Sequence, residues 1–278
     1  MVGTSVSLAL SRDGRYFATA AGKCDIELWD AQTGSHITTL EDTDRIHSLA
    51  FLPDGRLASG NKVGEVSLWD IVTNSRVPLV NAHSDKIVSL SATQSKLASG
   101  SEGKAVRVWD TTSWDRTSTF ECDDVVESVA LYTNDNRVAA CTLDTLYVWD
   151  TVTQKLITSN NISECRGLAV SNDGKWLAVA STESTSLYDA STLDRIWSHD
   201  RDSEFISFSP DSCQLVSANL NDGKVELIDV PNGNLVKSFN HVNVSRAVFS
   251  HDGTRVVSGG SRFVAPRIVL ISSIYQFP

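Results

Sequence analysis

The chain has 278 residues, of which 41% are hydrophobic and 21% charged, an ordinary balance for a globular protein. Its 24 basic and 34 acidic side chains give a net charge of −10, which argues against general nucleic-acid binding and against an anionic membrane surface, although a local basic patch is compatible with it. No apolar run approaches a membrane span, and residues 1–11 lack the features of a secretion signal. We therefore expect an intracellular protein, cytoplasmic or nuclear.

The start of the chain predicts four short strands separated by turns. Alternating apolar residues followed by a Ser-Arg-Asp-Gly turn predict a first hairpin, and Ala-Gln-Thr-Gly predicts the turn of a second. The strands expected in this first unit cover residues 5–10, 16–20, 25–29 and 36–40. The next unit repeats the order with strands at 46–51, 57–59, 65–69 and 77–80. No helical periodicity interrupts this stretch.

An aromatic residue followed by Asp marks the end of the third strand, and it recurs at a fixed interval. The pairs are Trp29-Asp30, Trp69-Asp70, Trp109-Asp110, Trp149-Asp150 and Tyr188-Asp189, followed by Ile228-Asp229 and Leu270-Ile271. The steps between them are 40, 40, 40, 39, 40 and 42 residues. A period of this length over the whole chain predicts a repeat architecture. Because one four-stranded sheet cannot bury both of its faces alone, the repeats predict an all-β ring of sheets.

The units resemble WD40 repeats. The resemblance rests on LWD at residues 28–30 and 68–70, VWD at 108–110 and 148–150, LASG at 57–60 and 97–100, and turns such as PDG at 53–55. It spans essentially the whole chain and implies a seven-bladed β-propeller in a single domain, residues 1–278. The expected blades cover residues 4–40, 44–80, 85–120, 125–158, 164–198, 203–239 and 243–278.

In the WD40 family a His, a Ser or Thr, an Asp and the Trp form a buried hydrogen-bonded set. Carried onto this chain by position, the resemblance implies structural roles for Thr19, Trp29, Ser59, Trp69, His83, Ser99, Trp109, Trp149, His199, Ser217, Asp222 and Ser258. Ala140 and Val179 replace the hydroxyl in units four and five, and no unit has all four members. Loss of both partners together can be nearly neutral, so we expect a propeller held mainly by apolar strands.

Catalytic, metal and cofactor motifs are not evident in the sequence. His199, Ser217 and Asp222 are the residue types of a nucleophilic triad, but no GxSxG elbow surrounds Ser217, and the resemblance implies a buried structural role for all three. The histidines form no HxH or HExxH pair, and no glycine-rich phosphate loop occurs. We therefore expect a protein without a cofactor or a bound metal.

The five cysteines, Cys24, Cys122, Cys141, Cys165 and Cys213, share no CxxC spacing and no common place in the repeat. Cysteines of an intracellular protein without paired spacing are rarely cross-linked or bound to metal. The sequence therefore predicts five isolated reduced thiols.

The loops at the ends of the blades are the expected binding surface, because a rigid scaffold presents their side chains. By the resemblance, the partner surface is formed by residues before the first strand and by those in the turn after the second. The residues expected there are Arg45, Lys62, Lys86, Glu102, Glu164, Asp202, Asn221 and Asn243. Basic residues gather in units two and three and acidic ones in five and six. A basic sector that takes an acidic or phosphorylated segment is our hypothesis, with a mixed solvated rim as the alternative.

The last unit has too few residues for a complete blade. Residues 272–278 are all that follows the third strand, so we expect three strands, or only a stub at residues 274–277. An unpaired edge near residues 267–271 would invite strand exchange or oligomer formation.

Two classes of function remain open. The first is a non-catalytic scaffold or adaptor that binds a peptide or protein partner on the propeller rim. The alternative is an enzyme on a propeller scaffold, hydrolase-like, with its site at the channel mouth. That alternative requires carboxylates or histidines that face one point in the channel, whereas a scaffold does not.

Overall fold

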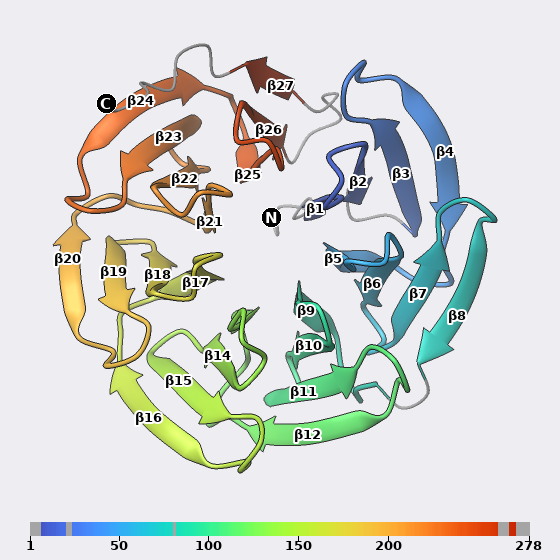
Figure 1. Ribbon diagram of the computed structural model, residues 1–278, viewed down its shortest axis with the longest axis horizontal. Coiled ribbons are helices and arrows are strands. Elements are labelled where there is room, and N and C mark those ends of the chain that lie inside the picture. The colour runs from blue at the N-terminus through green and yellow to red at the C-terminus, as the bar shows by residue number, and fades with distance from the viewer. Residues whose placement is uncertain (1–6, 21–23, 80–81, 261–266, 271–278) are drawn as a thin grey trace.

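The computed structural model describes residues 7–20, 24–79, 82–260 and 267–270, in which every regular element is a strand. The strands form sheets whose neighbouring members are antiparallel and follow one another in sequence. The sheets stand around a central axis, with the first strand of each nearest the centre and the last on the circumference (Figure 1).

The described residues form six sheets of four strands and one of three. Sheet one has β1 (Ser7–Leu10), β2 (Tyr16–Ala20), β3 (Asp25–Asp30) and β4 (His36–Glu41), and sheet two has β5 (Ile46–Phe51), β6 (Leu57–Asn61), β7 (Val66–Asp70) and β8 (Ser75–Leu79). Sheet three has β9 (Ile87–Ala92), β10 (Lys96–Ser101), β11 (Ala105–Asp110) and β12 (Arg116–Glu121), and sheet four has β13 (Ser128–Leu131), β14 (Arg137–Cys141), β15 (Thr145–Asp150) and β16 (Leu156–Asn161). Sheet five has β17 (Cys165–Val170), β18 (Trp176–Ser181), β19 (Thr185–Asp189) and β20 (Arg195–His199). Sheet six has β21 (Phe205–Phe208), β22 (Gln214–Asn219), β23 (Lys224–Asp229) and β24 (Leu235–Asn240), and sheet seven has β25 (Val244–Phe249), β26 (Arg255–Gly260) and β27 (Arg267–Leu270).

This arrangement confirms the all-β propeller that the repeats predict. Strand boundaries in sheets one and two agree with the expected ranges to within two residues at each end, because turn signals and alternation are local properties of the sequence. The expected stub of a fourth strand in sheet seven, at residues 274–277, lies outside the described residues. The open edge and the strand exchange that would follow from it stay predictions.

The Asp of each aromatic-Asp pair shapes the turn that follows the third strand. In sheet one, Oδ1 of Asp30 accepts the backbone N–H groups of Gln32 and Thr33 at 2.9 and 2.7 Å. The same pattern recurs at Asp70, Asp110, Asp150 and Asp189. These backbone hydrogen bonds lower the pKa of the Asp30 carboxyl. The repeated Asp is therefore a turn residue, as its local hydrogen bonding predicts.

The hydrophobic core lies between neighbouring sheets. Each interface contains a cluster of buried side chains, such as Leu146 of sheet four against Leu168 and Leu177 of sheet five. Hydroxyls join some of the innermost strands. Oγ of Ser89 accepts the N–H of Val129 in the next sheet at 3.1 Å, and Oγ of Ser128 accepts that of Leu168 at 3.1 Å. Inner-edge N–H groups are thereby paired between sheets.

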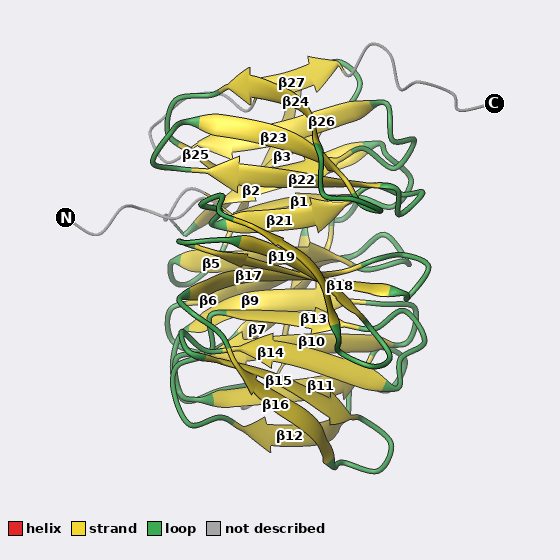
Figure 2. Ribbon diagram, turned by 90° about the vertical axis from the view of Figure 1, so that its left-hand side faces the viewer, coloured by secondary structure: helices red, strands yellow, loops and turns green. Residues whose placement is uncertain are grey.

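The strands run from one face of the ring to the other, so the loops and turns that connect them lie on these two faces (Figure 2). Among the described residues, no helix long and apolar enough to cross a bilayer is present. The two loop-bearing faces and the central channel are therefore the places to look for a binding site.

Candidate functional site

On one face, the turn after the second strand is hydrogen-bonded to the residue before the first strand of the same sheet. The N–H of Lys62 donates to the carbonyl of Arg45 at 2.8 Å, and that of Glu102 to the carbonyl of Lys86 at 2.9 Å. Sheet five repeats the contact between Thr182 and Glu164 at 3.3 Å. In sheets two, three and five these bonds join the two loops. These loops and their counterparts in the other sheets form a surface around the channel, here called the rim.

The basic residues of the rim surround His47 at the channel entrance. Burial, together with the nearby positive charges of Lys86, Arg45 and Lys62, lowers the pKa of His47 to about 4, against the opposing effect of Glu102. Nζ of Lys86 lies 2.6 Å from Oε1 of Glu102, so one carboxylate neutralises part of this basic sector. His47 is therefore neutral near pH 7.

His47 was not among the predicted site residues. A signal for it exists in the register of the inner strands, where His47 occupies the position of Glu127, Arg166 and Glu204 in later sheets. Sheet three has Val88 at this position. Because most of the other sheets have a polar residue there, the position indicates contact with the channel rather than with the core.

Two further acidic residues of the rim, Glu164 and Asp202, lie in sheets five and six, whereas Glu102 belongs to sheet three. Glu164 accepts a hydrogen bond from the hydroxyl of Thr182, and Oδ2 of Asp202 accepts one from Nδ2 of Asn221 at 2.7 Å. Burial, together with the charge of Asp202, raises the pKa of Glu204 at the channel wall. Asn243 lies before the inner strand of sheet seven with a left-handed φ of 63°. The rim thus carries charges of opposite sign on different sheets.

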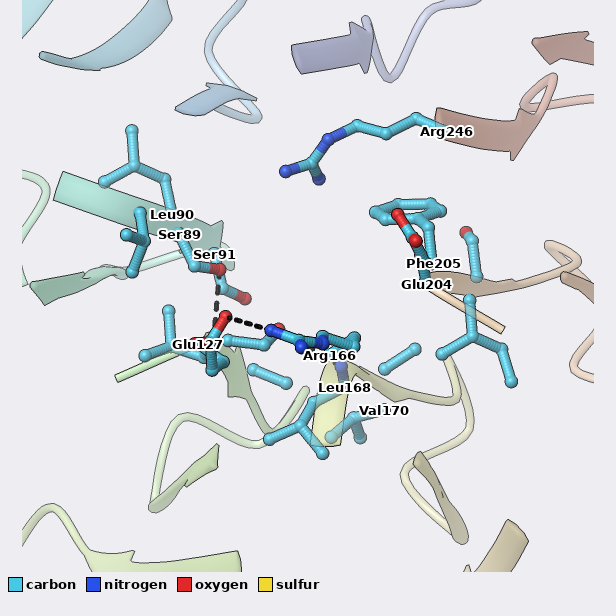
Figure 3. A pocket seen from close by; sticks show the side chains of 18 of the residues that line it. Ser89, Leu90, Ser91, Glu127, Arg166, Leu168, Val170, Glu204, Phe205 and Arg246 are labelled. Atoms are coloured by element: carbon cyan, nitrogen blue, oxygen red, sulfur yellow. Dashed lines mark hydrogen bonds and ion pairs between the residues drawn. The ribbon is translucent and has the colours of Figure 1, made fainter. Parts of the chain in front are cut away.

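A cavity of about 680 Å³ occupies the channel, and its wall is formed mainly by the inner strands of sheets three to seven. Charged side chains project into it (Figure 3). Nη1 of Arg166 lies 3.7 Å from Oε2 of Glu127, and the guanidinium carbon of Arg246 lies 4.9 Å from the centre of the Phe205 ring. Burial raises the pKa of Glu127 and lowers that of Arg246 to about 10. The sequence prediction did not include these channel residues.

The residue types of a nucleophilic triad are not brought together. Ser217 is buried, and its hydroxyl donates to Oγ of Ser203 at 2.8 Å. The ring of His199 packs on Trp197 with centroids 5.2 Å apart, and Asp222 is a surface residue 3.9 Å from Lys224. The expectation that these three residues share one buried structural set is wrong for His199 and Asp222. Ser203, which is fully buried, contacts the hydroxyl of Ser217 in place of His199.

The indole N–H groups of three predicted Trp residues donate to strand-two hydroxyls. Trp29 donates to Thr19 at 3.0 Å, Trp69 to Ser59 at 2.8 Å and Trp109 to Ser99 at 3.3 Å. Trp149, whose sheet has Ala140 at the hydroxyl position, instead stacks against Phe120 and Tyr147 at centroid distances of 5.1 Å. Trp149 in sheet four therefore packs on aromatic rings, in a sheet where both the hydroxyl and its histidine partner are absent.

In several sheets, a side chain from the segment before the inner strand also contacts the hydroxyl of the second strand. Nε2 of His83 lies 2.8 Å from Oγ of Ser99, and Nδ1 of His241 lies 2.7 Å from Oγ of Ser258. In sheet two the partner of Ser59 is a carboxylate, Oδ2 of Asp42, at 3.2 Å. Sequence reasoning missed the roles of Asp42, Ser203 and His241, because it searched for His at one fixed offset. In sheets four and five, Cys122 and Ile162 stand at the position that His83 has in sheet three.

The prediction of five isolated thiols is wrong for one pair. A disulfide joins Cys141, at the end of β14, to Cys165, at the start of β17. The other three cysteines are free, and those three include the exposed Cys213. The cross-link was missed because it joins residues of different sheets, a relationship that sequence spacing does not reveal. Within the described residues, no three His, Cys, Asp or Glu side chains gather in a metal-binding arrangement.

Comparison with known proteins identifies similar repeats. The family model of the WD domain, G-beta repeat, matches residues 75–110. A U3 snoRNP-associated protein-like EMB2271 of Arabidopsis thaliana is 31% identical over 90 residues, which are 32% of this chain and 19% of that protein. WD repeat-containing protein 55 of the same plant is 32% identical over 81 residues, 28% of this chain and 23% of that one.

A bacterial relative and a solved structure extend the comparison. An uncharacterized WD repeat-containing protein, sll1491, of Synechocystis sp. is 27% identical over 136 residues, 47% of this chain and 37% of its own length. The matches thus span between 19% and 37% of these relatives. A chain in a crystal structure of the mitotic checkpoint complex superimposes with a TM-score of 0.82 at 19% identity, covering 91% of this chain and 83% of that one. That likeness shows the fold alone.

Proposed function

Because this chain belongs to the WD40-repeat family, we propose that it is a non-catalytic scaffold or adaptor that binds a peptide or protein partner on its rim. We infer further that sheets one to seven are the seven blades of a single domain spanning residues 1–278, inside the cell. One relative is described as snoRNP-associated, and the solved neighbour comes from a checkpoint complex. The description of the snoRNP-associated relative names an assembly, which supports a scaffold.

The observation that carries this proposal is the joining of two loops at the rim in sheets two, three and five. Backbone hydrogen bonds fix Lys62 to Arg45 and Glu102 to Lys86, so their side chains are presented by rigid elements. A surface of this kind recognises a partner without reorganising its backbone, which lowers the entropic cost of binding. Charges of opposite sign on different sheets would fix the partner's orientation.

The proposed contact for an acidic or phosphorylated segment is the basic sector of Arg45, Lys62 and Lys86. These three cations lie close enough to His47 to lower its pKa, which supports their convergence on one place. Lys86 and Glu102 form an ion pair of 2.6 Å, and an incoming carboxylate or phosphate would compete with Glu102 for that lysine. The acidic residues Glu164 and Asp202 would meet basic groups of the same partner.

Affinity capture with mass spectrometry, using matched charge variants, tests the proposal. Arg45→Glu with Lys86→Glu should reduce recovery of the partners that the natural chain captures, and should flatten the salt dependence of binding. The control, Arg12→Glu with Lys155→Glu, makes the same change of charge at exposed turns between other strands. Equal capture by both double variants, each verified as folded by circular dichroism, would refute the basic sector as the contact. Loss of capture by both would refute a site confined to the rim.

A further inference from the structure

The disulfide of Cys141 and Cys165 crosses the interface between sheets four and five. Their Cα atoms are 6.4 Å apart, a separation that a disulfide spans. Both side chains are fully buried within a cluster that includes Leu146, Leu168 and Leu177. The bond therefore lies in the core rather than in a surface loop.

At other interfaces, the residues equivalent to Cys141 and Cys165 also lie against each other. A Cβ at Gly60 of β6 would overlap Ile87, the first residue of the next inner strand. A Cβ at Gly100 of β10 would lie 2.6 Å from Cγ1 of Val126 in sheet four. Cys141 has the place of Gly100 in its own sheet, since each pairs with a serine of its inner strand. The repeat geometry itself thus sets the close approach of Cys141 to Cys165.

Sheets four and five also lack a polar contact that is present in other sheets of the ring. Sheet three has His83 bonded to Ser99, and sheet seven has His241 bonded to Ser258. Sheets four and five instead have Cys122 with Ala140, and Ile162 with Val179. A covalent bond is therefore found between the two sheets in which this hydrogen bond does not occur.

We propose that Cys141 and Cys165 are an oxidative modification site, a dithiol pair whose oxidation ties sheet four to sheet five beside the rim. The inference does not rest on the proposed function. A low-molecular-weight disulfide such as glutathione disulfide is the oxidant. The thiolate of one cysteine attacks it and releases one glutathione thiol. The second cysteine, after losing its proton, then attacks the mixed disulfide and releases the other, so one S–S bond forms, one breaks and two electrons pass to glutathione.

Burial controls when this exchange occurs. Neither sulfur is accessible to solvent in the closed ring, so glutathione reaches the pair only when sheets four and five separate or before folding is complete. Reducing compartments keep thiols reduced, whereas oxidising conditions favour the bond. The oxidation state of this interface therefore reports the conditions under which the chain folded.

Oxidation affects the rim directly, because Glu164 precedes Cys165. The N–H of Cys165 donates to the carbonyl of Leu143 at 2.9 Å, and that of Thr182 donates to the carbonyl of Glu164. Reduction removes the covalent constraint on both bonds. Disulfides of this kind typically stabilise enough to change an opening equilibrium by roughly thirtyfold or more.

Peptide mapping and hydrogen exchange test the proposal on the full chain. The protein is refolded with glutathione disulfide or with a phosphine reductant and digested without reduction after alkylation. The oxidised sample should yield a cross-linked peptide containing Cys141 and Cys165. Exchange at the amides of Cys165 and Thr182 should be roughly thirtyfold faster in the reduced sample. Exchange at Lys62 and Glu102, in sheets two and three, should be equal in both samples.

Two variants separate this pair from the other thiols. Cys213→Ser removes an exposed thiol and should leave the redox response intact, whereas Cys141→Ser with Cys165→Ser should abolish it. Recovery of both cysteines as alkylated thiols after oxidative refolding would overturn the proposal. Equal exchange of the natural chain in its two redox states would also overturn it, even if the double variant failed to fold.

Discussion

The carboxylate of Asp42 and the guanidinium of Arg76 form an ion pair of 2.9 Å in which the Asp42 side chain is entirely inaccessible to solvent. Asp42 precedes the inner strand of sheet two, and Arg76 lies on its outermost strand, β8. The same carboxylate accepts the hydroxyl of Ser59, which in turn accepts the indole N–H of Trp69. One chain of polar contacts therefore runs across the whole sheet.

Replacement of Arg76 by Met should destabilise the protein strongly. A buried carboxylate that loses its cation is an uncompensated charge, so we expect a loss of about 3 kcal/mol in the free energy of unfolding. Urea denaturation followed by tryptophan fluorescence measures it, with the exposed Lys155→Met as control. A loss below about 1 kcal/mol would show that the pair is no stronger than a surface ion pair. Adding Asp42→His should recover stability, because it recreates the His and Ser contact of sheet three.

In sheet three, loss of one member of the His83 and Ser99 pair should cost more than loss of both. Ser99→Ala leaves the indole N–H of Trp109 without its acceptor and Nε2 of His83 without its hydrogen-bond partner, at an expected cost of about 2 kcal/mol. His83→Cys with Ser99→Ala recreates the Cys122 and Ala140 combination of sheet four. A double-mutant cycle by thermal or urea unfolding should show a smaller cost than the sum of the single variants. Strict additivity would mean that the two residues do not act together.

The chain should lose stability as the pH falls below 7, in part through His83. Burial, with added repulsion from Arg107 and Arg116, lowers the pKa of His83 to about 3 from an ordinary 6.5. Between these values the unfolded chain binds a proton that the folded chain does not, so stability rises with pH across this window. His83 alone should account for about 2 kcal/mol of loss between pH 7 and pH 5.

Urea denaturation at each pH, on the natural chain and on His83→Gln, isolates that contribution. Gln cannot be protonated in this range, so the free energy of unfolding of the His83→Gln variant should fall less steeply between pH 7 and pH 5. His47, whose pKa is also lowered, and the buried Glu127 and Glu204 are present in both proteins, and their effects cancel in the difference. If the free energy of unfolding had the same pH dependence in both proteins, His83 would not be buried in its neutral state.

Local features of the fold could be predicted from the sequence, whereas contacts between sheets could not. The Trp-Asp endings and Pro-Asp-Gly turns located the strands, because a turn depends on a few consecutive residues. Asp42 was missed because its buried position accepts any group that can bond the hydroxyl of Ser59, not His alone. Cys141 and Cys165 were missed for a different reason, since their contact depends on how one sheet leans on the next. The charged rim residues were chosen by position in the repeat, and their role in binding stays a prediction, whereas the cluster around His47 required coordinates.

The close approach between sheets three and four makes Gly100 intolerant of a side chain. A Cβ there would lie 2.6 Å from Cγ1 of Val126 and 2.7 Å from Cγ1 of Val129, well inside van der Waals contact. Both valines are buried, so neither has room to withdraw. Gly100→Ala should therefore lower the free energy of unfolding by about 2 kcal/mol, within the usual range for overpacking.

Compensation within the same interface distinguishes overpacking from a backbone effect. The φ angle of Gly100 is not in the left-handed region, so Ala is compatible with its backbone. Val126→Ala shortens the side chain that the new methyl group would meet. Gly100→Ala should therefore cost less in the Val126→Ala background than in the natural one, as measured by urea denaturation. At Gly103 the nearest atom would be 3.4 Å away, so Gly103→Ala should be the milder substitution. Equal costs for Gly100→Ala in both backgrounds would contradict contact between Gly100 and Val126, and with it the spacing that brings Cys141 to Cys165 in the next interface.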